Sequence, residues 1–209
     1  MNHCGKNASG VTRPGARCAA PAGRAPTRRR SIEQRPEPVE RREQFGHWEI
    51  DLVVGPTDST GAILTLVERK TRKTIMRKLK DKTHGAVRRA LNGIEREYGA
   101  EGFRLIFKSI TADNGSEFLD VDGLQNSVLC RPPRTALFYA HPYAAWERGT
   151  NENTNRMIRR FIAKKQKIES LTRHALETVE QWLNNYPRRI IAFNSPNQQF
   201  NHELAQIAA

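Results

Sequence analysis

Three acidic residues that could act together in catalysis stand far apart in the sequence: Asp51, Asp113 and Glu152. Three carboxylates within a few ångströms repel one another and shift their pKa values unless cations neutralise them. Oxygen ligands without His or Cys suit Mg²⁺ or Mn²⁺. Two such ions, about 4 Å apart, could support an in-line phosphoryl transfer. If the fold gathers these acids, they predict a site for two divalent ions.

Each acid also has an ordinary structural explanation. Asp51 could point to solvent from an alternating strand, and Asp113 opens an Asp-Asn-Gly turn. Glu152 could lie in the first turn of a helix, where the macrodipole favours an acid, and pair with Arg156. Taken singly, none of the three identifies a site, so the argument depends on the elements that carry them.

The composition favours a polyanionic partner. The 209 residues carry a formal net charge of +13 and a pI of about 10.2. Such an excess of basic residues is typical of proteins that bind nucleic acid. A ribosomal protein or a non-specific basic surface would show the same net charge, so charge alone identifies no activity.

The cysteines and the hydrophobic pattern indicate the compartment. Cys4, Cys18 and Cys130 have no paired or metal-ligand spacing, which suggests reduced thiols in a cytosol. No apolar run approaches the roughly 20 residues that span a membrane, and no secretory signal is visible. We expect a cytoplasmic, nucleoid-associated protein with no membrane partner.

The chain divides by composition near residue 46. Residues 1–46 are rich in Gly, Ala, Pro and Arg and predict a disordered basic arm. Residues 47–54 are β-prone, carry Asp51 and end at Gly55-Pro56. Two further strands are expected at 62–68 and 74–79, which makes an antiparallel meander.

Helices and parallel strands follow. Apolar residues at helical spacing predict a helix over 83–98. The chain then returns to the sheet as a strand at 105–111, which ends near Asp113. Residues 119–135 read as a helix-poor connection before a short strand at 136–140. Glu152 opens the next helix. Further helices are expected at 171–185 and from Ser195-Pro196 onwards.

This order of elements is that of a ribonuclease H-like α/β fold: a mixed five-stranded sheet flanked by helices, with a C-terminal helical segment. We assign residues 47–165 to a catalytic core and 166–209 to its helical extension. The three acids then fall on a central strand, at the end of its neighbour and on a facing helix. From these positions the three carboxylates can converge.

Four sequence blocks carry a resemblance to a known family. They are GHWEID (46–51), TLVER (65–69), TADNGSEF (111–118) and WERGTNENTN (146–155). Over about residues 40–200 the chain resembles the insertion-sequence transposases of the IS 30 family, which have an integrase-like core. The resemblance implies that Asp51, Asp113 and Glu152 are the metal-binding catalytic acids, with Glu147 as a rival for the third place. It also implies cleavage of DNA at element ends and strand transfer, by a homo-oligomer on double-stranded DNA.

Basic and amide side chains near these blocks are candidates for DNA contact. Asn151 and Asn155 could orient Glu152 or touch DNA. The arginine and lysine candidates for phosphate contact, which could equally be solvated surface, are Arg69, Lys70, Arg72, Lys73, Arg148, Arg156 and Arg159.

The chain departs from the family in two places. Residues 1–46 lack the helix-turn-helix pattern that usually precedes the core, so we expect a truncated chain. Residues 163–167 stand where the family has a loop with Pro and Gly, which leaves the end of the catalytic helix open. The alternative hypothesis is a catalytically inactive, truncated remnant that only binds DNA.

Overall fold

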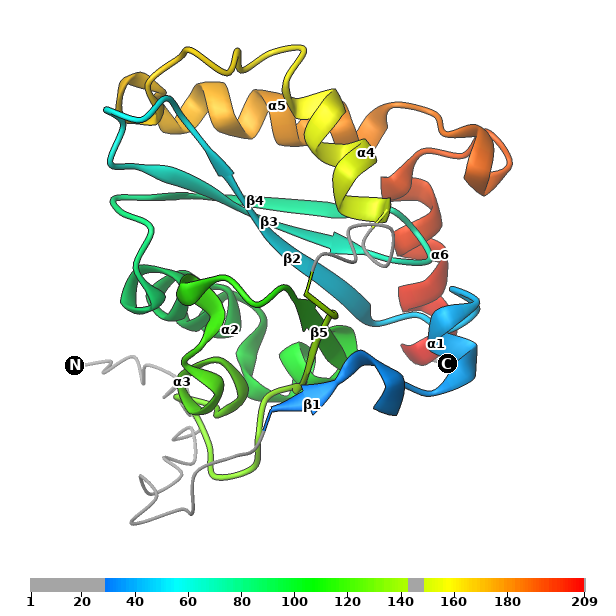
Figure 1. The fold of residues 1–209 in the computed structure, drawn as a ribbon. Helices are drawn as coiled ribbons and strands as arrows, with labels where there is room; N and C mark the ends of the chain where they lie inside the picture. Colours follow the sequence, from blue (N-terminus) through cyan, green and yellow to red (C-terminus); the bar gives the residue numbers. More distant parts are fainter. Residues whose placement is uncertain (1–28, 143–148, 209) are drawn as a thin grey trace, which may run out of the picture.

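The structure is a computed structural model that describes residues 29–142 and 149–208. Its centre is a mixed six-stranded sheet with the strand order β1-β6-β5-β2-β3-β4 (Figure 1). The strands are β1 (Arg30–Ser31), β2 (His47–Val54), β3 (Ala62–Glu68), β4 (Thr74–Leu79), β5 (Ser109–Ala112) and β6 (Ala136–Tyr139). The α-helices are α1 (Glu37–Glu40), α2 (His84–Ile106), α3 (Val121–Gln125), α4 (Gly149–Ile158), α5 (Arg173–Asn185) and α6 (Pro196–Ala208).

The sheet confirms the predicted fold class. Strands β2, β3 and β4 form an antiparallel meander, while β5 pairs in parallel with β2 and with β6. The predicted count of five strands is wrong by one, because β1 adds a sixth strand parallel to β6. Its two residues, Arg30 and Ser31, lie opposite Phe138 and Tyr139, more than a hundred positions away, and local sequence carries no signal for such a pairing.

Helices cover both faces of the sheet. In Figure 1, α2 and α3 lie below the sheet, and α4 and α5 lie above it. Because side chains alternate along a strand, Trp48 and Ile50 of β2 pack in the core beneath, whereas Val53 packs with Met157 and Ile158 of α4. Asp51 has the parity of Val53, so β2 presents it to the α4 face.

The segment before β2 is folded where the structure describes it. Residues 1–28 of the expected disordered arm lie outside the described residues, but 29–46 form β1, a 3₁₀ turn (Ile32–Gln34) and α1. Ile32, Val39 and Phe45 are buried. The disorder expected for residues 29–46 is therefore wrong, because three well-spaced apolar side chains are buried and hold this Pro- and Arg-rich segment in the fold.

Helix α2 is longer than expected. It is interrupted at Gly99, whose φ of 72° is left-handed, and continues to Ile106. Strand β5 accordingly begins at Ser109, four residues later than predicted. Phe103 and Phe107 stack on each other with ring centroids 4.2 Å apart, so this second helical piece is held by the core.

The remaining differences are small. The expected helix-poor connection contains the short helix α3, and α4 ends at Ile158. None of the helices in the described ranges combines the length and the apolar character needed to cross a membrane.

Candidate active site

Two of the three candidate acids come from neighbouring parallel strands. Glu49 of β2 lies opposite Thr111 of β5 in the parallel register. Asp51 follows two residues later in β2, and Asp113 two residues later just past the end of β5, so both acids lie near the same end of this strand pair. The Asp113 carboxylate also accepts a hydrogen bond from the Gly115 N–H, with Oδ1 and N 2.9 Å apart. Asp113 therefore makes the expected turn and still lies beside the strand of Asp51.

Helix α4 contacts this site through the side-chain amide of Asn155. Asn155 Nδ2 donates a hydrogen bond to Asp51 Oδ2 over 2.6 Å. Glu152 is exposed one turn earlier, and residues three apart share a helix flank. The helix thus presents Glu152 on the flank that faces Asp51.

The three carboxylates suit a hard divalent cation in their chemistry, since all the donors are oxygens. Their positions, however, do not surround a single point. Within residues 29–142 and 149–208, no three His, Cys, Asp or Glu side chains lie close enough together to hold a metal ion. The structure therefore relates Asp51, Asp113 and Glu152 to one region, without gathering them into one ligand cluster.

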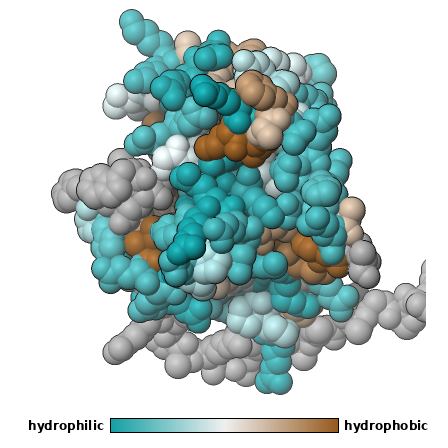
Figure 2. Space-filling view, turned by 90° about the vertical axis from the view of Figure 1, so that its right-hand side faces the viewer, coloured by the Kyte–Doolittle hydropathy of each residue, from teal (hydrophilic) through white to brown (hydrophobic). Residues whose placement is uncertain are grey.

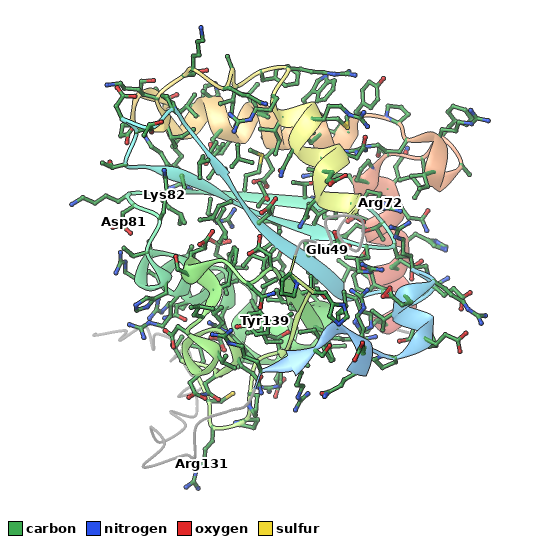
Figure 3. The ribbon with its side chains drawn as sticks, viewed as in Figure 1. Glu49, Arg72, Asp81, Lys82, Arg131 and Tyr139 are labelled. Carbon is green, nitrogen blue, oxygen red and sulfur yellow. The ribbon has the colours of Figure 1, made fainter. Side chains whose placement is uncertain are left out.

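A buried polar network lies beneath the first turn of α4. Glu49 is fully buried and forms an ion pair with Arg69. Its Oε2 also accepts a hydrogen bond from the Asn151 N–H over 3.3 Å. Arg72 donates from Nη1 to Thr150 Oγ1 over 2.8 Å. Figure 3 shows Glu49 and Arg72 close together beneath this end of α4.

This network corrects part of the expected DNA surface. Arg69, Arg72 and Asn151 are all buried, so none of them presents a side chain to a partner on the outside. Burial lowers the pKa of Arg72 to about 10, and the like charge of Arg42 acts in the same direction. At neutral pH Arg72 still carries its charge.

The two lysines of the same turn are engaged with α6. Lys70 Nζ lies 2.7 Å from Glu203 Oε1, and Lys73 Nζ donates to Asn197 Oδ1 over 2.6 Å. The turn at residues 69–73 is therefore docked within the protein and is not a free hairpin tip.

The arginines of α4 and of the turn after it have different surroundings. Arg156 is exposed and its Nη2 donates to Asn153 Oδ1 over 2.9 Å. Arg159 donates to the Val54 carbonyl over 2.7 Å, and burial lowers the pKa of its guanidinium. Arg148 and Glu147 lie outside the described residues. Arg156 thus remains the described candidate whose charge faces outward.

A basic cavity beside α4 was not anticipated from the sequence. We call it the arginine pocket; it has a volume of about 760 Å³. Its lining residues are Arg42, Arg72, Gly149, Thr150, Asn153, Thr154, Arg156, Met157, Arg160, Tyr186, Pro187, Arg188, Arg189, Ile190 and Phe193. The signal for it in the sequence is the mixture of basic and apolar residues at 186–193, which directly follows a helix.

Sequence comparison relates the chain to insertion-sequence transposases. It is 39% identical over 180 residues to a probable transposase for the insertion-like sequence element IS1161 of Streptococcus salivarius, covering 86% of this chain and 48% of the relative. It is 36% identical over 174 residues to the transposase InsI for insertion sequence element IS30C of Escherichia coli (strain K12), covering 83% and 43%. The chain spans about half the length of the curated relatives it matches. No protein-family model matches it.

Structural comparison supports the fold assignment. The catalytic core domain of BIV integrase superposes with a TM-score of 0.57 at 16% identity, covering 79% of this chain and 100% of that domain. Such a likeness at low identity concerns the fold alone. By sequence, the chain is similar to insertion-sequence transposases, among them that of IS30C, over about half of their length, and its fold is the ribonuclease H-like fold seen in integrase catalytic cores.

Proposed function

We propose that this chain is the catalytic part of a DNA transposase that cleaves DNA at element ends and transfers the resulting 3′ hydroxyl to target DNA. Asp51 and Asp113 would hold Mg²⁺ or Mn²⁺, and Glu152 would complete the site. The observation that carries the proposal is the hydrogen bond from Asn155 to Asp51, because it fixes α4 beside the strand of the first acid. The similarity to transposases supports the choice of substrate.

The protein's own groups have distinct roles in this proposal. Asn155 orients the Asp51 carboxylate, and the buried Glu49 accepts from Asn151, which ties the first turn of α4 to β2. Arg156 meets a DNA phosphate without reading the base, as basic side chains generally do. Divalent cations held by the acids would neutralise charge and activate the attacking oxygen.

The partner we propose is double-stranded DNA, bound by a homo-oligomer in the nucleoid. The net charge of +13 supports this, since phosphate contacts supply most of the affinity of DNA-binding proteins.

A binding-only protein is the second candidate. It is favoured by one observation, namely that the described side chains form no three-ligand metal cluster. Such a protein would hold DNA in a salt-sensitive manner, without dependence on Mn²⁺ or on Glu152.

The test is nicking and strand transfer on supercoiled plasmid DNA in Mn²⁺, comparing the native chain with Glu152→Gln. We expect the rate to fall by about 10²–10³, the usual loss when one group that stabilises the transition state is removed. Glu101→Gln is the matched control, because Glu101 is also an exposed helical acid but lies on α2. Equal inactivity of the native chain and Glu152→Gln, with DNA binding retained, would favour the binding-only protein. Equal nicking by both would reject the catalytic role of Glu152.

A further inference from the structure

The arginine pocket carries an unbalanced positive charge. Six of its lining residues are arginines, and none of the described lining residues is acidic. In the described part of the chain, none of the six lies within ion-pair distance of a carboxylate. Arg72 and Arg188 are more than nine-tenths buried, and each has an Nε without a hydrogen-bond partner. A cluster of this kind is suited to an anion such as a phosphodiester.

Aromatic side chains border the same pocket. Phe193 is 71% exposed and Tyr186 is 43% exposed. Tyr186 continues a ring series with Trp182 and Phe161, with centroid separations of 4.8 Å and 4.6 Å. These rings offer exposed faces at the rim of a basic cavity, a combination typical of sites for unpaired nucleic-acid strands.

The loop that carries Phe193 is built to hold the ring outside the core. Ala192 and Phe193 both have left-handed φ values, of 53° and 62°, which are rare for these residue types. Reciprocal backbone bonds close the loop: Phe193 N donates to Arg188 O over 2.9 Å, and Arg188 N donates to Asn194 O over 3.0 Å. In Figure 1 this orange connection stands out from the body near the N-terminal end of α4.

The surface around the loop is unlike a protein-docking face. The side of the molecule turned to the viewer in Figure 2 is largely hydrophilic, with apolar side chains in small separate patches. A permanent protein interface would bring a broader apolar surface.

The pocket and the candidate acids lie on opposite flanks of α4. Asn155, which binds Asp51, marks one flank, whereas Asn153, Met157 and Arg160 line the pocket on the other. Glu152 and Arg156 lie between them on a helix with 100° between residues. A strand that crosses the exposed ridge of α4 therefore passes from the acids to the pocket.

From this arrangement we propose that the arginine pocket binds unpaired nucleotides of a DNA strand next to the reacting phosphate. Arg156, Arg160 and Arg189, whose side chains are exposed, bind the phosphates, and the buried Arg72 and Arg188 add positive charge to the pocket. Tyr186 and Phe193 stack on the bases. In a duplex the base faces are stacked on one another, so exposed rings gain contact only with unpaired bases. The volume suits a nucleotide, since small-ligand pockets span roughly 300–1,000 Å³. The position beside a reacting phosphate rests on the proposed function, whereas the preference for unpaired DNA does not.

The experiment measures binding of the full chain to two fluorescein-labelled DNAs, a blunt duplex and the same duplex with a short oligothymidine overhang. We expect tighter binding of the overhang substrate. Phe193→Ala and Arg160→Ala should each weaken that binding, Phe193→Ala by about 5- to 150-fold, the range for loss of one stacked base. Binding of the blunt duplex should change little. Circular dichroism checks folding, which neither exposed side chain determines.

Leu105→Ala and Arg131→Ala are the matched controls. Leu105 is 48% exposed on α2, and Figure 3 shows Arg131 pointing away from the body at the end far from α4. Equal affinity for blunt and overhang DNA, or equal losses in the pocket and control variants, would overturn the inference. An overhang preference in a chain that does not nick DNA would retain the pocket and reject the transposase proposal. Nicking without an overhang preference would retain the transposase proposal and reject the pocket as a site for unpaired DNA.

Discussion

At the scale of single residues, Glu49 connects three elements of the site. This buried carboxylate of β2 binds Arg69 in the turn after β3 and accepts from the backbone of Asn151 in α4. Burial lowers the pKa of Arg69, and the charge of Glu49 opposes that shift. A buried ion pair of this kind fixes the relative position of its elements, while its net contribution to stability is small.

Removing one partner of that pair should cost more than removing both. Glu49→Leu leaves the buried Arg69 with only the longer, half-exposed ion pair to Glu40, so we expect a loss of up to about 3–5 kcal/mol in the free energy of unfolding. Glu49→Leu combined with Arg69→Met replaces both charges by apolar groups and should recover much of that loss. Urea unfolding measures both quantities. A double variant no more stable than Glu49→Leu would show that the pair itself stabilises the fold.

The same pair explains why the DNA surface was only partly predictable. Arg69 and Arg72 stand in a run of basic residues, which is typical of a solvated turn. The sequence also has an acid at Glu49, two positions before Asp51 and on the same face of the strand. The alternation of side chains along the strand therefore places both carboxylates on one face and does not distinguish them. The register of β2 against β3 brings Glu49 near the end of β3, where Arg69 follows.

At the scale of elements, α5 protects an open edge of the sheet. Strand β4 is the last strand of the order, so one side of its backbone has no neighbouring strand. Asn184 of α5 both accepts from the N–H and donates to the carbonyl of Thr74, each over 2.8 Å. Glu180 accepts from the Met76 N–H over 2.8 Å. Covering an edge in this manner prevents pairing with another chain.

The hydrogen bonds from α5 to the edge strand β4 lead to a stability prediction. Asn184→Leu keeps the helix propensity but leaves two buried backbone groups of Thr74 unpaired, at roughly 1–3 kcal/mol for each. We expect a lower urea midpoint and increased light scattering from edge-to-edge association. Gln181→Leu, at an exposed position of the same helix, should leave both unchanged. A stable and monodisperse Asn184→Leu variant would contradict the role given to α5.

The elements that were predicted best are those with a local pattern. The bounds of β2, β3 and β4 agree with the sequence, because each strand is a β-branched run closed by turn residues. The predicted strand at 105–111 began too early, because Leu105-Ile106-Phe107 is apolar and reads equally as strand or buried helix. Phe103 and Phe107 stand four residues apart, which is a helical spacing, and their stacking accompanies the continuation of α2 past Gly99 to Ile106.

At the scale of the whole molecule, the net charge and one buried histidine together determine the response to acid. The chain already carries a net charge of +13, so each further proton adds to self-repulsion in the compact state. Burial lowers the pKa of His47 from 6.5 to about 4, and the charges of Lys108, Arg69 and Arg35 act in the same direction. His47 Nδ1 lies 2.7 Å from Ser109 Oγ, so the neutral ring is held in place.

The contribution of His47 to the stability of the folded state should therefore fall between pH 6.5 and pH 4. In that window the unfolded chain binds a proton at His47 that the folded chain does not, so the free energy of unfolding falls as the pH is lowered, by at most about 1.4 kcal/mol per pH unit. Burial raises the pKa of Glu68 and of Glu180, which gives the opposite slope above pH 4.5. Those contributions are common to the native chain and to His47→Gln and cancel in the difference between them. Urea titrations across this window should show a shallower dependence on pH in His47→Gln, and equal slopes would mean that His47 takes up its proton while the protein is still folded.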